Sequence, residues 1–294
     1  MGTLYISAIM ICRVAQHLCN KRTSNCISNM RLFFKYSAFR QLLSSVFGLV
    51  LIFISQSEFK CNFKTILISS FSGLMLVSSI GFSLSVLKMG TVALSSMFAT
   101  AGLLVPCIAG IFLFNETMSA SQWCGVGLFF LAAYFLISSS SKIYCKFSFK
   151  LFLLLLGVLL SNGFTMLSQL MFARYVPDGN VSVFSFFSFA IGGMFMLILS
   201  FVTAKNTESG EVSKFTPKLL GLGAVLSIAV FIINQLATMA AAIVSPVILF
   251  TFINGGSTII GAVVAAVFFH EKLTTKSVIG IIIGVLSMII IKKI

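Results

Sequence analysis

Charged residues are scarce in this chain, and negatively charged ones are the scarcest of all. Charged side chains make up 9% of the 294 residues, against about 25% in a typical soluble domain. Hydrophobic residues make up 59%, and the mean hydropathy is +1.10. No soluble fold of this length could bury so much apolar surface, so the composition predicts an integral membrane protein in contact with lipid. Because each spanning helix needs about 20 residues, the length allows roughly ten of them.

The sequence also lacks the signatures of several classes of site. The cysteines number seven, an odd count, and no Cys-x-x-Cys pair occurs, which argues against a disulfide framework or a zinc site. The two histidines, His17 and His270, lie far apart, and no GxxxxGK[ST] motif for ATP is present. No nucleophile and base stand in a recognisable arrangement. We therefore expect a protein that is not an enzyme, with no catalytic residues, no metal and no cofactor.

Positive charge outweighs negative charge by a wide margin. There are 20 Lys and Arg against six Asp and Glu, a net charge of +14. Such an excess can indicate nucleic-acid binding in a soluble protein, but here the basic residues lie between apolar runs and form no stripe with interleaved aromatics. We expect the partners to be the lipid bilayer and a small-molecule substrate, and no nucleic acid; the oligomeric state stays open. No buried carboxylate stands out as a proton carrier, which leaves uniport or exchange open.

Ten apolar runs predict ten transmembrane helices. The runs are 15 to 26 residues long and show no strict alternation of apolar and polar residues, which a membrane-spanning barrel would require. The first run is short and contains Arg13, so it is the least typical span. The predicted spans cover Leu4–Leu18, Tyr36–Ile54, Ile66–Leu87, Val92–Phe114, Gln122–Ser138, Leu151–Phe172, Val181–Val202, Leu219–Ala242, Val244–Phe269 and Ser277–Ile291.

One pattern of fifteen residues occurs twice. Residues 111–125 read IFLFNETMSASQWCG, and residues 266–280 read AVFFHEKLTTKSVIG. Each copy ends an apolar run, then has a glutamate two residues after a phenylalanine, a short polar turn, and a glycine nine residues past the glutamate. The pattern predicts a structural hairpin in each copy, built on Glu116 and Gly125 in the first and on Glu271 and Gly280 in the second.

The offset between the two copies is 155 residues, about half the chain. This spacing indicates a duplicated membrane unit, with a first repeat at 1–141 and a second at 142–294. Five spans per unit is an odd number, so the two copies must cross the membrane in opposite directions. The predicted fold is therefore an all-α integral membrane protein with ten transmembrane helices arranged as two inverted five-helix repeats, an arrangement that many transporters share.

The repeated hairpin, Pro106 before the first glutamate and Asn254-Gly255-Gly256 before the second resemble the EamA-type transporters of the drug/metabolite transporter superfamily. The resemblance covers essentially the whole chain. It implies ten helices, a central cavity between the halves and alternating access, with export favoured over uptake, and it is almost uninformative about the substrate. Together with the polar residues within the spans, it leads us to expect a multi-pass protein of the cell membrane that transports a small polar or anionic metabolite. The alternatives are a non-transporting membrane subunit or lipid-carrier scaffold, and a drug efflux protein.

Glu116 and Glu271 allow two interpretations. They could be proton or cation sites, or they could be helix-end residues that stay hydrated at a tight turn. An ionised group costs several kcal/mol at the centre of a bilayer and little at its boundary. Because each glutamate follows the end of a span, the structural interpretation is favoured.

Arg13 is the most informative charge. A charged residue inside a span is a functional-site hypothesis by default, and a fixed positive charge suits a carboxylate or phosphate on a substrate. Residues 8–14 resemble the first helix of the small multidrug resistance relatives, whose essential carboxylate lies about where Arg13 is. This departure disfavours carboxylate-driven exchange of cationic drugs. Alternatively, Arg13 extends to the lipid headgroups, and Arg40 is interpreted as such an interfacial anchor.

Amide side chains inside the spans are the other candidates for binding a substrate. Gln16 and Gln169 occupy matching places in the two repeats, at an offset of 153 residues. The alternative role for these amides is hydrogen bonding between helices, worth about 0.6 kcal/mol on average. Serines of the third span, such as Ser78 and Ser79, can bond their own backbone and rank lower. The amides expected to line a cavity are Gln16, Asn162, Gln169, Asn234, Gln235 and Asn254.

Two arguments about the orientation of the chain disagree. Ten spans put both termini on one side, and the resemblance implies that this side is the cytoplasm. The segments on the side of the termini would then carry five basic residues, and the opposite segments thirteen. Cytoplasmic segments normally hold the excess of Lys and Arg, so the charge count favours termini outside.

Overall fold

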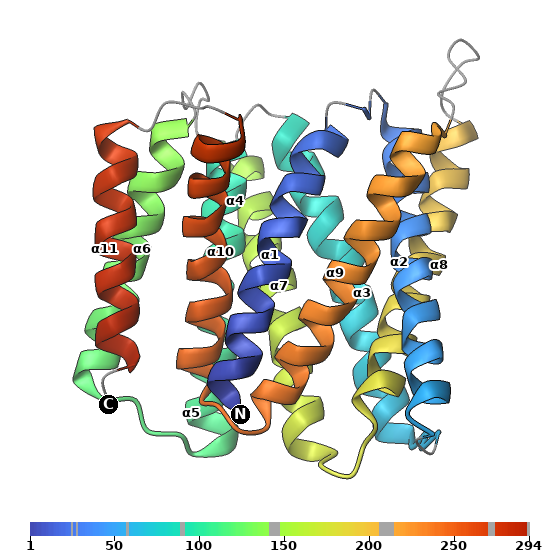
Figure 1. Cartoon of the computed structure of the whole chain (residues 1–294), viewed down its shortest axis with the longest axis horizontal. Helices are drawn as coiled ribbons and strands as arrows, with labels where there is room; N and C mark the ends of the chain where they lie inside the picture. The colour runs from blue at the N-terminus through green and yellow to red at the C-terminus, as the bar shows by residue number, and fades with distance from the viewer. Residues whose placement is uncertain are drawn as a thin grey trace.

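The computed structural model describes residues 1–24, 26–27, 29–56, 59–88, 92–140, 148–205, 215–269 and 274–292, and every regular element in these ranges is an α-helix. The helices run side by side, roughly parallel or antiparallel to one another, as a single bundle (Figure 1). They are α1 (Gly2–Ser24), α2 (Met30–Ile54), α3 (Phe63–Lys88), α4 (Val92–Ala101), α5 (Leu104–Phe114), α6 (Ala120–Ser140), α7 (Phe149–Tyr175), α8 (Val181–Lys205), α9 (Pro217–Ala241), α10 (Pro246–Phe269) and α11 (Thr275–Lys292).

The bundle exposes apolar side chains and buries polar ones, the reverse of a soluble protein. Phe53 and Phe112 are both 79% exposed, whereas Ser185 and Thr238 are fully buried. Among the described residues, seven stretches are long and apolar enough to cross a membrane. They lie in α2, α3, the α4–α5 pair, α7, α8, α9 and α10. The chain is therefore an all-α, multi-pass membrane protein, as the composition predicted.

Three further helices are less typical of spans. α1 is 23 residues long but is less apolar than the other helices, because it carries Arg13, Gln16 and His17. Apolar residues of α6 and α11 form the shorter stretches Ala120–Leu136 and Thr275–Ile291. All three nevertheless run alongside the longer helices of the bundle (Figure 1).

The predicted span over Val92–Phe114 agrees with a candidate membrane span at Ser95–Phe114, but the structure divides its helix into α4 and α5. The helical hydrogen-bond pattern stops at a turn over Gly102 and Leu103, where Leu103 N–H donates to the Thr100 carbonyl (3.2 Å). Pro106 has no N–H to donate to the Gly102 carbonyl, and its ring would clash with that group in a continuous helix. The break itself lies four residues before the proline, at Gly102.

The predicted start of the second span is wrong. α2 begins at Met30 rather than at Tyr36, because Asn29 caps the helix by accepting a hydrogen bond from Leu32 N–H (2.9 Å). The apolar run starts later than the helix does, since the first turns of α2 carry Arg31 and Lys35. As a consequence Arg40 lies ten residues into the helix, about 15 Å from its start.

α6 and α11 pack through the two glycines of the repeated hairpin. A Cβ on Gly125 of α6 would lie 2.5 Å from Ile291 Cγ1, and a Cβ on Gly280 of α11 would lie 2.8 Å from Leu136 Cγ. These two contacts are related by the repeat offset, since 280 − 125 = 155 and 291 − 136 = 155. Both glycines thus have a structural role at one helix crossing, with each helix using its own copy of the pattern.

Both termini lie at the same edge of the bundle, together with the connection between α2 and α3 and the segment between α5 and α6 (Figure 1). Glu271 of the second hairpin and the predicted boundary between residues 141 and 142 lie outside the described residues.

Candidate functional site

A cavity of about 350 Å³ lies inside the bundle, between helices from both halves of the chain. α1, α2, α3, α7, α8, α9 and α10 each contribute to its wall. The structure brings together six of the seven predicted binding residues here, and adds Arg40. The polar lining consists of Arg13, Gln16, Arg40, Ser79, Asn162, Thr165, Gln169, Asn234 and Asn254.

Arg13 is the middle residue of α1, so it lies as far from the helix ends as the helix allows. Its Nη1 donates a hydrogen bond to Gln16 Oε1 at 2.7 Å, one turn further along the helix. Its Nε is buried and has no hydrogen-bond partner. A buried donor without a partner is costly. The guanidinium is therefore positioned by Gln16 and keeps an Nε–H donor that has no acceptor.

Arg40 enters the same cavity from α2 and was not predicted to do so. Its backbone position is fixed by a reciprocal pair of bonds, in which Ser227 Oγ donates to the Arg40 carbonyl (3.0 Å) and Ser44 Oγ donates to the Ser227 carbonyl (3.1 Å). These bonds join α2 to α9 beside the cavity. The signal that could have identified Arg40 was Asn29, whose capping ability marks an earlier helix start and moves the arginine inward.

The described lining of the cavity holds no acidic counterpart for the two arginines. The chain has only six Asp and Glu, at positions 58, 116, 178, 208, 211 and 271. Of the two that the structure describes, Glu116 follows α5 and Asp178 lies in the turn between α7 and α8. Within the described part of the chain, no carboxylate pairs with Arg13 or Arg40. The lining therefore carries two positive charges and no negative one.

The amides around the cavity differ in how strongly they are hydrogen-bonded to other protein groups. Asn162 Nδ2 donates to the Ala99 carbonyl (2.5 Å), which ties α7 to α4. Asn254 Nδ2 meets only the thioether sulfur of Met166 (3.3 Å), a weak acceptor. Asn254 is consequently available to a better acceptor on a bound molecule.

A chain of buried hydrogen bonds leads away from the cavity along α9. Gln169 Nε2 donates to Asn234 Oδ1, and Asn234 Nδ2 is 3.2 Å from Ser185 Oγ. Ser185 Oγ in turn donates to Gln235 Oε1 (3.0 Å), and Gln235 Nε2 donates to Ser182 Oγ (2.9 Å). This chain joins α7, α8 and α9, so these amides hold helices together as well as lining the site.

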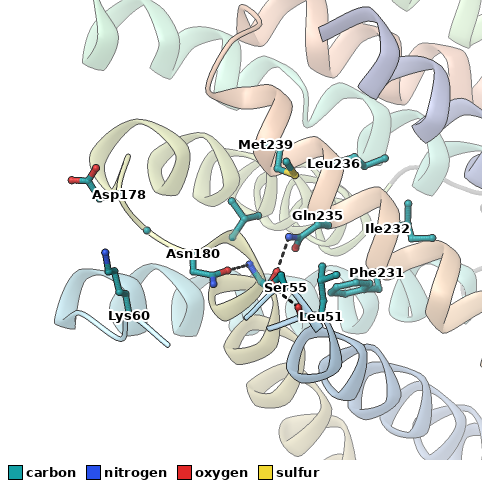
Figure 2. Close-up of a pocket in the computed structure, with 13 residues that line it drawn as sticks. Leu51, Ser55, Lys60, Asp178, Asn180, Phe231, Ile232, Gln235, Leu236 and Met239 are labelled. Carbon is teal, nitrogen blue, oxygen red and sulfur yellow. Dashed lines mark hydrogen bonds between the residues drawn. The ribbon is translucent and has the colours of Figure 1, made fainter. Parts of the chain in front are cut away.

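Gln235 does not line the central cavity, although it was predicted to do so with Asn234. Successive residues of a helix point about 100° apart, so one side chain faces the cavity and the other faces a second pocket. That pocket has a volume of about 820 Å³ and is lined by α2, α9 and the turn between α7 and α8. Figure 2 shows Gln235 beside Phe231 and Met239, with Lys60 and Asp178 toward the opposite end of the pocket.

Ser79 also lines the cavity, although the serines of this helix ranked low from the sequence. The expectation holds for Ser78, whose Oγ donates to the Leu74 carbonyl of its own helix (2.9 Å). Ser79 is one position further along and faces the cavity. No sequence signal separates the two serines, since only the packing of α3 against α7 and α8 decides which of them faces inward.

Glu116 lies just past the end of α5 and forms an ion pair that the sequence did not reveal. Arg174, in the last turn of α7, approaches Glu116 Oε1 with its Nη2 at 2.9 Å and donates from Nε to the Ala241 carbonyl (3.2 Å). Burial raises the pKa of the Glu116 carboxyl above its ordinary value, while the charge of Arg174 opposes the rise. The pair links the ends of α5, α7 and α9 at the edge where the termini lie.

An apolar cluster separates the cavity from that edge. Some members of the cluster lie closer to that edge than the cavity residues of the same helix do: Ile9 precedes Arg13 in α1, Leu170 follows Gln169 in α7, and Ala240 follows Ala237 in α9. Other members, such as Met166 and Ile253, line the cavity itself. Phe250 and Leu103 belong to the same cluster. The cavity is thus closed by packed side chains on the side of the termini.

Within the described ranges, no three His, Cys, Asp or Glu side chains gather as metal ligands. His17 instead pairs with Ser257 Oγ at 3.0 Å.

Comparisons with known proteins address the fold alone. No family model and no curated protein sequence matches the chain. One solved crystal structure superposes with a TM-score of 0.76 over 99% of this chain and 97% of its own, at 11% sequence identity. The chain therefore shares its whole architecture with a protein of known structure.

Proposed function

We propose that the chain is a secondary transporter of a small polar or anionic metabolite, related to the EamA-type transporters. The observation that carries the proposal is the cavity of about 350 Å³, which is lined by two arginines and five amides halfway along the helices. Ligand-binding cavities typically measure about 300 to 1,000 Å³. Charged groups at this depth are costly and mark substrate pathways in membrane proteins.

The pairing of the helices supports two inverted repeats of five. If α1, α2 and α3 correspond to α7, α8 and α9, the contact of α3 with α7 corresponds to that of α9 with α1. Likewise, the contact of α3 with α8 corresponds to that of α9 with α2, and all four contacts occur. The reciprocal contacts of Gly125 and Gly280 follow the same exchange. The common edge of the two termini agrees with an even number of spans (Figure 1).

Alternating access requires the closed side of the cavity to open. In this structure the apolar cluster around Phe250 and the Glu116–Arg174 pair close the side of the termini. A partly exposed ion pair contributes only about 0 to 1 kcal/mol, so it can break and reform during a rocking movement of the two halves.

The alternatives are less well supported. A non-transporting subunit or lipid-carrier scaffold would use its internal polar residues to join helices and would leave no cavity, whereas this bundle has one. A drug efflux protein for cations would need a negative charge in the cavity, and the described lining is positive.

The proposal predicts that a small solute stabilises the purified protein. A ligand at 100 times its Kd stabilises a protein by about 2.7 kcal/mol, which a shift in thermal unfolding would detect. We expect a shift from at least one member of a panel of amino acids, sugar phosphates, nucleosides, dicarboxylates and quaternary amines, together with flux of that solute in liposomes. If the whole panel leaves both unfolding and flux unchanged, the transporter proposal fails.

The charge distribution predicts that the termini face outward. Cys61 is exposed and belongs to the connection between α2 and α3, and this connection lies at the edge of the termini (Figure 1). In intact cells, a membrane-impermeant maleimide should label a variant that retains only Cys61. A cysteine-free variant with Lys218→Cys, at the opposite end of the bundle and also exposed, should react only after permeabilisation. The reverse result would place the termini in the cytoplasm, as the family resemblance implies.

A further inference from the structure

Two guanidinium groups line the same cavity, and each is deep within its helix. Arg13 is the middle residue of α1, and Arg40 lies about 15 Å from the start of α2. These positions keep both arginines away from the helix ends, where side chains reach the headgroups. Interfacial anchoring therefore does not account for either arginine.

No residue of the described cavity lining compensates the two charges. The two described carboxylates, Glu116 and Asp178, both lie in connections between helices. Arg13 donates to a neutral amide, Gln16, and keeps a buried Nε without a partner. Charges inside proteins are normally paired, whereas the described lining carries two positive charges that no carboxylate balances.

We propose that the substrate is a small organic anion with two negative charges, a phosphate monoester or a dicarboxylate, bound between Arg13 and Arg40. This inference rests on the proposed function and specifies its substrate class. Guanidinium groups bind carboxylate and phosphate oxygens through parallel N–H donors.

The rest of the cavity fits such a ligand. Asn254 has an amide N–H₂ group that meets only a thioether, and it can donate to a hydroxyl or carbonyl oxygen of the substrate. Phe189, Ile253 and Phe250 line other parts of the wall. These apolar side chains suit a short carbon skeleton, and the limited volume excludes a large one.

The test compares dianions with matched solutes that carry less charge, at about pH 7.5, above the second phosphate pKa of about 6. The probes are succinate against monomethyl succinate, and glycerol 3-phosphate against glycerol. Thermal unfolding and direct calorimetric binding are measured on the purified full chain. We expect succinate or glycerol 3-phosphate to bind about tenfold or more tightly than its matched partner.

Variants then assign the site. Arg13→Gln and Arg40→Gln should each weaken dianion binding by about tenfold or more. Each should also raise the unfolding temperature without ligand, since each removes a positive charge inside the bundle that no described carboxylate pairs with. Arg40→Lys keeps the charge and should retain part of the binding. Arg31→Gln is the matched control, because Arg31 is exposed at the start of the same helix, and it should bind as the parent does.

The outcomes separate this inference from the proposed function. If monomethyl succinate, glycerol or a quaternary amine binds as tightly as the dianions, the substrate class is wrong, while a transporter remains supported. Unchanged dianion binding in both glutamine variants would overturn the assignment to the two arginines. If no solute of any charge binds or crosses the membrane, the proposed function itself fails.

Discussion

Liposomes that contain the purified protein and internal succinate are expected to take up labelled succinate at least about tenfold faster than liposomes without an internal anion. To return empty, the carrier must carry two uncompensated arginines through its occluded state. An arginine at the centre of a membrane costs about 2.5 to 3.5 kcal/mol even on the lower scales. A difference of about 1.4 kcal/mol in the barrier already changes the rate tenfold. A bound dianion neutralises both charges, so the loaded form should cross much faster than the empty one, and transport should be an exchange.

The measurement uses glycerol 3-phosphate in place of succinate if only the phosphate ester binds. Internal glycerol serves as the control for osmotic effects, and Arg31→Gln serves as the control for surface charge. Arg13→Gln should reduce the uptake into loaded liposomes and also reduce its dependence on internal anion, because its empty form carries one charge fewer. Equal uptake with and without internal anion, in the absence of any ion gradient, would contradict the exchange mechanism.

The class of the protein follows from its sequence because composition alone decides it. With 59% hydrophobic and 9% charged residues, the apolar surface of the protein must be in contact with lipid. The bundle accordingly exposes Phe53 and Phe112 and buries Ser185. The amides could also be selected in advance, since an uncharged polar residue in a long apolar run must find a partner inside the protein. Five of the six predicted amides therefore meet at one cavity, together with Arg13.

What the sequence could not provide depends on where helices begin and how they turn. Arg40 was assigned to the membrane boundary because its apolar run starts at Tyr36, yet the capped helix starts six residues earlier, at Met30. Gln235 was grouped with Asn234, yet adjacent residues on a helix face different neighbours. The partner of Glu116 was hidden for another reason: Arg174 lies 58 residues away along the chain, and only the packing of α7 beside α5 brings them together.

Replacing Gly163 by alanine is expected to destabilise the protein by about 1 to 3 kcal/mol. Gly163 of α7 lies against the turn between α4 and α5, and a Cβ there would overlap Val105 Cγ2 and lie 2.6 Å from the Gly102 carbonyl oxygen. The carbonyl belongs to the backbone and cannot rotate away. Gly102 has the converse constraint, since its own Cβ would lie 2.9 Å from Gly163 N. The two backbones therefore touch, as they do at small-residue crossings in other membrane proteins.

Thermal unfolding of the purified variants in detergent measures this effect, and Gly221→Ala is the matched control. Nothing lies within 4 Å of a Cβ at Gly221 in α9, so alanine there should stabilise the helix by up to about 1 kcal/mol. A Gly→Ala substitution is thus predicted to lower stability at Gly163 and to raise it at Gly221. This difference separates the effect of packing from that of helix propensity. Since Asn162, the neighbour of Gly163, bonds to the Ala99 carbonyl and lines the cavity, Gly163→Ala should also weaken dianion binding. Equal unfolding temperatures for the two variants would show that α7 and the α4–α5 turn are not in backbone contact.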